Sequence, residues 1–153
     1  MDNVRKEIKM KTFMKSVFLV LIVVITGSNI LFAQNESENA VKSTLNKLFE
    51  FSKSKSYEKA AVYIAYEGED KNRVGKESFN AANKDELNLV KRTLKKISAL
   101  LEISNRHEFG KFSTSQTDGK DIFSIEIEYF SNDQKIIETY SFIKNEKGYL
   151  LIK

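Results

Sequence analysis

Cysteine and proline are both absent from the 153 residues of the sequence. Without cysteine the chain has no disulfide, no thiolate metal site and no thiol nucleophile, and it offers no sulfur for lipid attachment. Without proline, no helix or strand is interrupted by a residue that lacks a backbone N–H. Stability must therefore come from a packed core and not from disulfides.

The chain contains a single histidine, His107. It lies in the polar stretch Asn105-Arg106-His107-Glu108, which we expect at the surface, with no second histidine or patterned carboxylate for metal binding or acid–base work. The sequence also lacks Gly-x-Ser-x-Gly and any phosphate-binding glycine loop. Glu126 and Glu128 share one face of a predicted strand, where solvation is their ordinary role. We therefore predict no catalytic residue, no metal and no cofactor.

The net charge is small once its position along the chain is considered. The formal charge is +4, but five basic and two acidic residues lie before residue 17. Residues 34–153 carry 20 basic and 19 acidic side chains, so they have no general electrostatic attraction for nucleic acid. A basic group on one predicted helix lacks interleaved aromatic residues and is expected to be a solvated face: Lys91, Arg92, Lys95 and Lys96. We therefore predict no nucleic-acid partner.

An unbroken run of nine large apolar residues, 17–25, follows the basic N-terminal end. The polar break Gly27-Ser28-Asn29 comes next, and Leu31-Phe32-Ala33 then leads to Gln34. This order is typical of a secretory signal peptide, and glutamine after the cut resembles the signal peptides of Bacteroidetes-type bacteria. We predict cleavage after Ala33, which leaves residues 34–153 as a periplasmic or secreted domain without a membrane attachment.

An uncleaved anchor is the alternative interpretation of the same segment. Residues 17–33 number only 17 and include four small or polar residues, so they barely reach the lower limit for spanning a bilayer. In either case the basic end stays in the cytoplasm and the domain lies outside it. Met10 or Met14 are alternative starts that would give a shorter basic end.

Residues 37–104 have the apolar periodicity of helices. In the first predicted helix Val41, Leu45 and Leu48 share one face. A second, shorter helix is expected from Tyr57 to Ala65, with Ser56 as its cap. A third has Asn83 or Asp85 as its cap and presents apolar residues at spacings of three and four: Leu87, Val90, Leu94, Ile97 and Leu101.

Residues 109–153 alternate between apolar and polar side chains, as strands do. The strands are expected at Phe109–Gln116, around Phe123–Tyr129, at Ile136–Lys144 and at Tyr149–Ile152. Asp118-Gly119 is a strong hairpin signal between the first two strands. Short turns between successive strands predict an antiparallel meander, with one face packed on the helices. The predicted fold class is α+β.

The order of these elements resembles the cystatin-like, NTF2-like superfamily, and is especially similar to the small exported bacterial NTF2-like domains of unknown function (the DUF4878 type). Three segments carry the resemblance: Ser56-Tyr57-Glu58-Lys59-Ala60-Ala61, the strand Ile125–Tyr129, and Lys144-Asn145-Glu146-Lys147-Gly148-Tyr149-Leu150-Leu151. A tryptophan is usual in that family where Tyr149 stands here. The resemblance implies a curved sheet around a long helix, often with a conical pocket that serves catalysis in some relatives and binding in others.

The segment Tyr66–Lys76 is expected to be a loop, because it holds two glycines and six charged residues. Its carboxylates lack the alternating order of a calcium loop, and self-paired surface charges explain them more simply. If the domain has a pocket, this loop is expected at its rim. Our candidate ligand-binding residues are Tyr63, Tyr66, Glu67, Arg73 and Tyr140.

Two functions remain open at this stage. The first is a non-catalytic envelope domain that binds a small apolar ligand or a protein partner, with the outer sheet face near Ile122 and Phe130 available for a partner or a homodimer. The second is an enzyme of the isomerase or dehydratase kind, as the resemblance implies. Such an enzyme needs a buried acid–base residue, and only Tyr63, Tyr129 or Tyr140 point inward by pattern.

Overall fold

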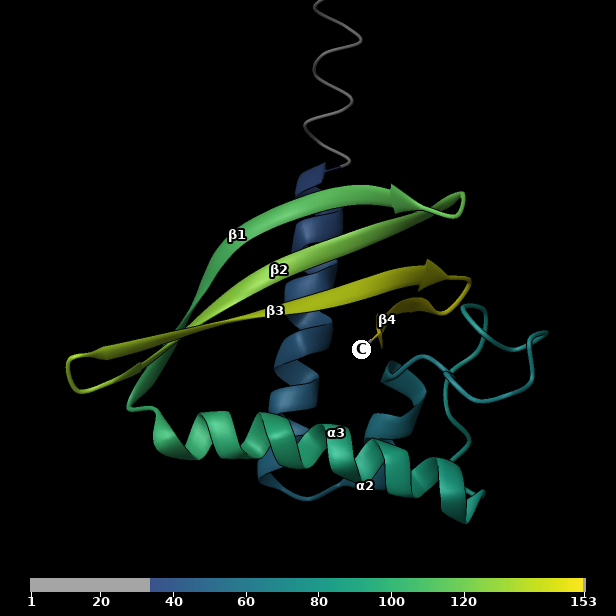
Figure 1. Cartoon of the computed structure of the whole chain (residues 1–153), viewed down its shortest axis with the longest axis horizontal. Coiled ribbons are helices and arrows are strands. Elements are labelled where there is room, and N and C mark those ends of the chain that lie inside the picture. Colours follow the sequence, from purple (N-terminus) through teal and green to yellow (C-terminus); the bar gives the residue numbers. More distant parts are fainter. Residues whose placement is uncertain (1–33, 153) are drawn as a thin grey trace, which may run out of the picture. The chain divides into compact units, whose positions relative to one another are not determined.

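The computed structural model describes residues 34–152 of the chain (Figure 1). By its internal contacts the chain divides into two compact units, Met1–Glu36 and Ser37–Lys153, and the second contains the whole sheet. The predicted signal peptide, residues 1–33, lies outside the described residues. Among the described residues, no helix combines the length and the apolar character that a membrane span requires.

The second unit is an α+β domain in which three helices pack on a four-stranded antiparallel meander. A first helix covers 34–53 of the described residues. It is followed by α2 (Tyr57–Ala60), a short 3-10 turn η1 (Ala61–Tyr63) and α3 (Lys84–Ile103). The strands are β1 (Arg106–Thr117), β2 (Lys120–Ser131), β3 (Gln134–Asn145) and β4 (Gly148–Ile152), and they lie side by side in sequence order. The predicted fold class is confirmed.

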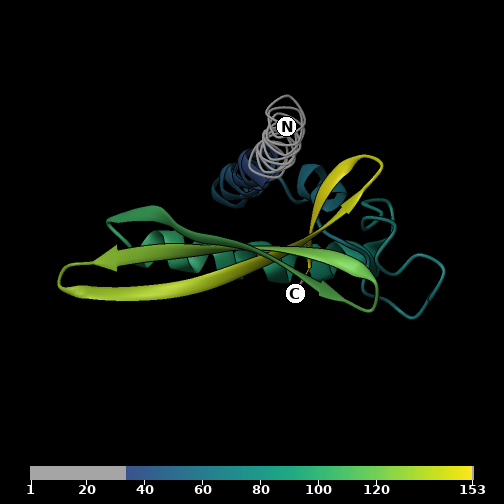
Figure 2. The same ribbon diagram turned by 90° about the horizontal axis from the view of Figure 1, so that it is seen from above.

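The strand register puts one set of apolar side chains on a single face of the sheet. Phe123 pairs with Phe142, Ile125 with Tyr140, and Phe142 also with Leu151. Directly paired residues point to the same face, and the first helix crosses that face, as Figures 1 and 2 show. Figure 2 also shows β4 bending toward the first helix.

The main core lies between this inner face and the helices. Its helical part includes Val41, Leu45, Leu48, Val90 and Leu94, each 0% exposed. Each such side chain contributes about 1.5–3 kcal/mol by leaving water. The outer face carries a smaller apolar cluster, in which Ile122 and Ile152 pack against Ala65, Ile143 and Leu150.

The second helix is shorter than predicted. It ends at Ala60, continues for one 3-10 turn to Tyr63, and has no side-chain cap from Ser56. Ile64 and Ala65 are extended instead: Ile64 forms a parallel bridge with Leu151, and the Ala65 N–H donates to the Leu151 carbonyl over 2.8 Å. The chain leaves the helix because it can bury these residues and satisfy the free edge of β4 at the same time.

The first strand begins earlier than predicted, at Arg106 rather than Phe109. Its pairing with β2 runs from Arg106 opposite Phe130 to Thr117 opposite Lys120, with a bulge between Phe109 and Phe112. The bulge lets the long strand bend with the curved sheet. As a result, the polar stretch before Phe109 belongs to the sheet and not to a surface connection.

Candidate functional site

A cleft of about 350 Å³ lies where α3 meets β3 and β4. Because β4 ends at Ile152, opposite Ser141, the first half of β3 has a sheet neighbour only in β2. Figure 1 shows α3 running along this part of β3. We call this the apolar cleft; its walls include Ile97 and Leu100 of α3, Tyr140 of β3 and Leu151 of β4.

The rim of the apolar cleft is polar. Thr93 and Lys96 contribute from α3, and Glu138 and Thr139 from β3. Lys96 and Glu138 are both exposed, so each charge remains hydrated and they balance one another. An uncharged interior with a small polar rim suits an apolar molecule that carries a polar end.

Two buried tyrosines lie beside this cleft. The hydroxyl oxygens of Tyr129 and Tyr140 are 2.8 Å apart, and the two residues are 1% and 7% exposed. Burial raises the pKa of Tyr129 to about 12 and raises that of Tyr140 further, where the hydrogen bond with Tyr129 adds to it. Both therefore remain protonated at neutral pH and serve as hydrogen-bonding groups, not as bases.

His107 is only partly exposed, where the sequence predicted a surface position. It lies in β1 opposite Tyr129 and is half-buried. Its ring meets that of Phe49 edge-on, with 5.1 Å between the centroids. Burial, together with the nearby charge of Lys53, lowers the pKa of the imidazole. His107 is therefore a neutral part of the aromatic packing, and residues 34–152 contain no cluster of three potential metal-ligating side chains.

Arg73, in the 66–80 loop, is held by contacts with Tyr66, Glu77 and Glu86. Its guanidinium carbon lies 3.8 Å from the centroid of the Tyr66 ring. Its Nη1 and Nη2 atoms donate to the two carboxylate oxygens of Glu86 over 2.9 and 3.1 Å, and its Nε donates to Glu77 over 2.8 Å. The positive charge of Arg73 is thus shared by two carboxylates.

Glu86 is the residue of this group that sequence reasoning missed. It is 8% exposed and also accepts the Asn80 N–H over 2.6 Å, and the bond from Arg73 lowers the pKa of its carboxyl. The available signal was its place three residues after the cap Asn83, whose side chain accepts the N–H groups of Asp85 and Glu86. A glutamate at that position commonly reaches back toward the preceding turn.

The five predicted ligand-binding residues do not form one site. Tyr66 and Arg73 contact each other, whereas Tyr140 lines the apolar cleft. Tyr63 packs on the first helix, where its ring centroid lies 5.9 Å from that of Phe51. Glu67 is exposed at the start of the loop.

The residues expected on an open outer sheet face have partners within the chain. Ile122 packs on the outer cluster, and the Arg106 guanidinium carbon lies 4.1 Å from the centroid of the Phe130 ring. The exposed apolar pair of the sheet is instead Ile136 and Ile137, at 41% and 49%. As successive residues of β3, these two point to opposite faces.

Comparison with known proteins gives no match: no family model, no curated protein and no solved structure is significantly similar to the chain.

Proposed function

We propose that the chain is an exported, non-catalytic NTF2-like domain that binds a small apolar ligand in the apolar cleft. The cleft between α3 and β3 is the observation that carries this proposal. Its volume of about 350 Å³ falls at the lower end of the range for small-molecule sites, about 300–1,000 Å³. The order of helices and strands, with the first helix across the inner sheet face, supports the NTF2-like assignment.

The tyrosine pair supports recognition of one polar group on the ligand. Two hydroxyls contain two O–H donors, and their mutual bond uses one of them. Tyr140 lines the cleft, so when Tyr129 donates in the mutual bond, the Tyr140 hydroxyl can donate to a carbonyl or hydroxyl at the inner end of a ligand. The raised pKa values keep both hydroxyls protonated for this role.

A small ligand is favoured over a protein partner by the distribution of exposed apolar side chains. The large ones among the described residues are Val62, Val74, Ile103, Ile136 and Ile137. They belong to η1, the 66–80 loop, the end of α3 and β3, and the two residues of β3 point to opposite faces, whereas a docking surface needs a continuous apolar patch.

The test fills the apolar cleft with a bulky side chain and measures the binding of a dye. Leu100→Trp puts a large ring into the cleft, and Ala99→Trp adds the same ring at the neighbouring exposed position of α3. We expect saturable one-to-one binding of the uncharged dye Nile red to the unchanged protein and to Ala99→Trp, and at least tenfold weaker binding to Leu100→Trp. Equal affinity in both variants, with both folded by circular dichroism, would contradict the proposal.

An isomerase-type enzyme is the second candidate, because Glu138 lines the same cleft as Tyr140. In such an enzyme Glu138 would take a proton from a substrate while the tyrosine pair donated to the oxygen that becomes negative. The exposure of Glu138 disfavours this role, since such enzymes hold their acid–base residue deep in an apolar pocket. Glu138→Gln separates the two functions: it leaves dye binding unchanged in a binding protein and abolishes proton exchange of a bound ketone in an enzyme.

Export is part of the proposal and has its own measurement. A protein recovered from the periplasm or medium should have a mass that corresponds to a chain beginning at Gln34. A mass that still includes residues 17–33 would contradict cleavage and favour the anchor.

A further inference from the structure

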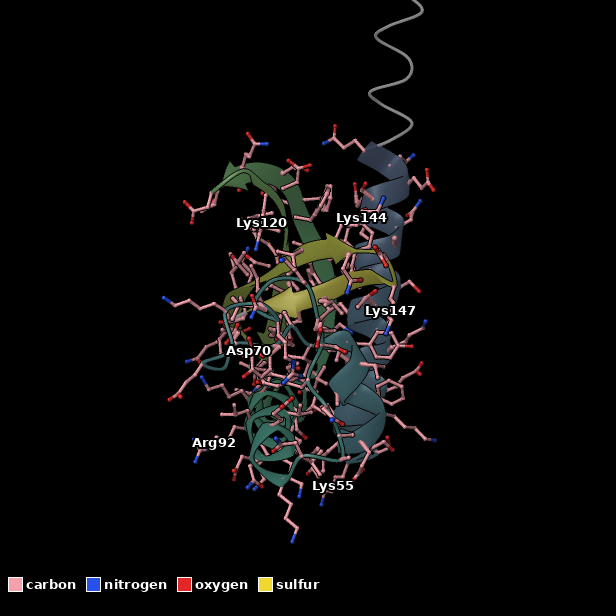
Figure 3. All side chains as sticks on the ribbon, turned by 90° about the vertical axis from the view of Figure 1, so that its right-hand side faces the viewer. Lys55, Asp70, Arg92, Lys120, Lys144 and Lys147 are labelled. Carbon is pink, nitrogen blue, oxygen red and sulfur yellow. The ribbon has the colours of Figure 1, made fainter. Side chains whose placement is uncertain are left out.

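A second and larger cleft, of about 880 Å³, lies between the 73–80 loop and the β3–β4 turn. We call it the lysine cleft, after Lys76 on the loop, Lys144 near the end of β3 and Lys147 on the turn. A smaller neighbouring hollow shares Gly75 and Lys144 with it and adds Lys120. Figure 3 shows Lys120, from β2, and Lys144 and Lys147, from the end of β3 and the turn that follows it, at the same end of the sheet.

The lysines of this cleft have no ion pair among the residues that the structure describes. Within residues 34–152, no carboxylate oxygen lies within ion-pair distance of the nitrogen of Lys76, Lys120, Lys144 or Lys147. Of the two glutamates that line the cleft, Glu77 is paired with Arg73. The lining therefore has a local excess of positive charge, because Lys76, Lys144 and Lys147 stand against Glu146 alone, while Lys120 shares its hollow with Asp121.

One side chain holds the two walls of the lysine cleft together. The Asn145 Nδ2 donates to the carbonyl of Lys76 over 3.0 Å, and the Asn145 Oδ1 accepts the N–H of Lys147 over 2.9 Å. The backbones that carry these two lysines are thus fixed relative to each other before any ligand binds. Such pre-organisation lowers the entropy that binding must overcome.

The remaining two lysines also have defined positions. The Lys144 nitrogen lies 5.7 Å from the centroid of the Tyr149 ring. The Lys120 nitrogen packs so closely on Gly75 that a side chain at position 75 would collide with it. Gly75 also has a φ of +69°, a conformation that glycine adopts without strain. The loop therefore brings Lys120 to the border of the lysine cleft.

We propose that the lysine cleft binds a small ligand that carries two or more phosphate groups. A lysine ammonium is a compact charge that suits phosphate oxygens, and a hollow lined by charges of one sign concentrates the opposite ion. The separation of the lysines on two walls, and a volume well above that of one phosphate, favour a multivalent ligand. This site is distinct from the apolar cleft, so either can fail without the other.

Pyrophosphate is the probe, measured by isothermal titration calorimetry at low salt without divalent cations. We expect saturable one-to-one binding, weakened at least tenfold in the variant Lys76→Gln/Lys144→Gln/Lys147→Gln. The control Lys59→Gln/Lys95→Gln/Lys111→Gln removes the same charge from exposed positions elsewhere and should change the affinity less than twofold. Binding of Nile red in the apolar cleft should be the same in both variants.

Asn145→Ala tests the positioning role, because it removes no charge. We expect about threefold weaker pyrophosphate binding with an unchanged salt dependence, since the lysines remain but are no longer held. Three results would overturn the inference: no saturable binding, an equal loss in the two lysine triple variants, or citrate binding as tightly as pyrophosphate. The last would mean that any compact polyanion is accepted and that phosphate is not recognised.

Discussion

The hydroxyls of Tyr129 and Tyr140 satisfy each other inside an otherwise apolar inner face. Replacing either tyrosine by phenylalanine leaves the other hydroxyl buried without this partner, which costs about 1–3 kcal/mol of the unfolding free energy. Replacing both removes the unsatisfied group as well, so the double variant should be nearly as stable as the original. Urea unfolding of the four proteins gives the coupling energy. A double variant that loses the sum of the two single losses would contradict this pairing.

The same pair predicts the behaviour of the protein in alkali. Because burial raises both tyrosine pKa values above their ordinary value, to about 12 for Tyr129, folding favours the protonated forms. Their stabilisation is fully present below the ordinary tyrosine pKa, about 10, and is lost as the pH rises toward the folded values. The unfolding free energy should therefore decline above about pH 10, and less steeply in the double phenylalanine variant. Equal slopes for the two proteins would be the contrary result.

Glu86 should make the stability of the protein depend on pH in acid, as the tyrosine pair does in alkali. Its pKa is lowered by Arg73, so its contribution is present above the ordinary glutamate pKa of about 4.3 and is lost as the pH falls through the folded value. Glu86→Gln should cost about 1 kcal/mol near pH 7 and flatten the acid side of the stability profile. Glu77→Gln is the matched control, because that carboxylate is exposed and should change stability by less than about 0.5 kcal/mol. A larger loss from Glu77→Gln would reverse the assigned roles.

At this scale the sequence identified apolar positions better than polar ones. Alternation along the predicted strands put Tyr129 and Tyr140 inward, and both are buried. It gave no indication that the two hydroxyls meet, because the register of β2 against β3 decides that contact. Glu86 was missed, and the partial burial of His107 was not predicted, for a related reason: each contacts a partner distant in sequence, Arg73 for one and Phe49 for the other.

Among the elements, the Asp118-Gly119 turn tests how far local chemistry fixes the meander. Both residues have positive φ, +51° and +73°, as a two-residue hairpin turn between twisted strands requires. A Cβ at Gly119 would meet no other atom within 4 Å. Gly119→Ala therefore isolates backbone strain and should lower the unfolding free energy by about 1 kcal/mol, as measured by urea unfolding.

The control for this turn is Asp118→Asn. Asparagine tolerates positive φ, so this change should leave stability within about 0.5 kcal/mol of the original. A Gly119→Ala variant as stable as Asp118→Asn would mean that the strands, and not the turn residues, determine the hairpin.

Elements with a strong local pattern were predicted well, and those that depend on the sheet were not. The α3 helix has both its cap, Asn83, and its buried row of Val90, Leu94 and Ile97 as expected. By contrast, Ile64 and Ala65 look helical by their spacing but are extended. Their conformation is set by pairing with the free edge of β4. The apolar spacing within residues 57–65 cannot predict a contact with a strand so distant in sequence.

For the whole molecule, both proposed ligand sites depend on β3 and β4. The apolar cleft exists where β4 has already ended beside β3, and the lysine cleft exists where the two strands turn. The sequence predicted the strands and the loop at residues 66–76, but neither cleft. A cleft is defined by what three separated segments leave unfilled, and that requires their arrangement in space.

The first helix should decide whether the domain folds at all. Val41, Leu45, Leu48 and Phe49 of this helix are at most 3% exposed, and burial of about 1.5–3 kcal/mol each makes about 6–12 kcal/mol together. That is as large as the total stability of a typical domain, about 5–15 kcal/mol. A chain that begins at Gln34 should therefore unfold cooperatively on heating, as followed by circular dichroism, whereas one that begins at Lys55 should show no cooperative transition and should bind apolar dyes nonspecifically. Cooperative unfolding of the shorter chain would mean that the sheet and α3 form a sufficient core without the first helix, and the apolar cleft between α3 and β3 would then have to be tested in that shorter protein.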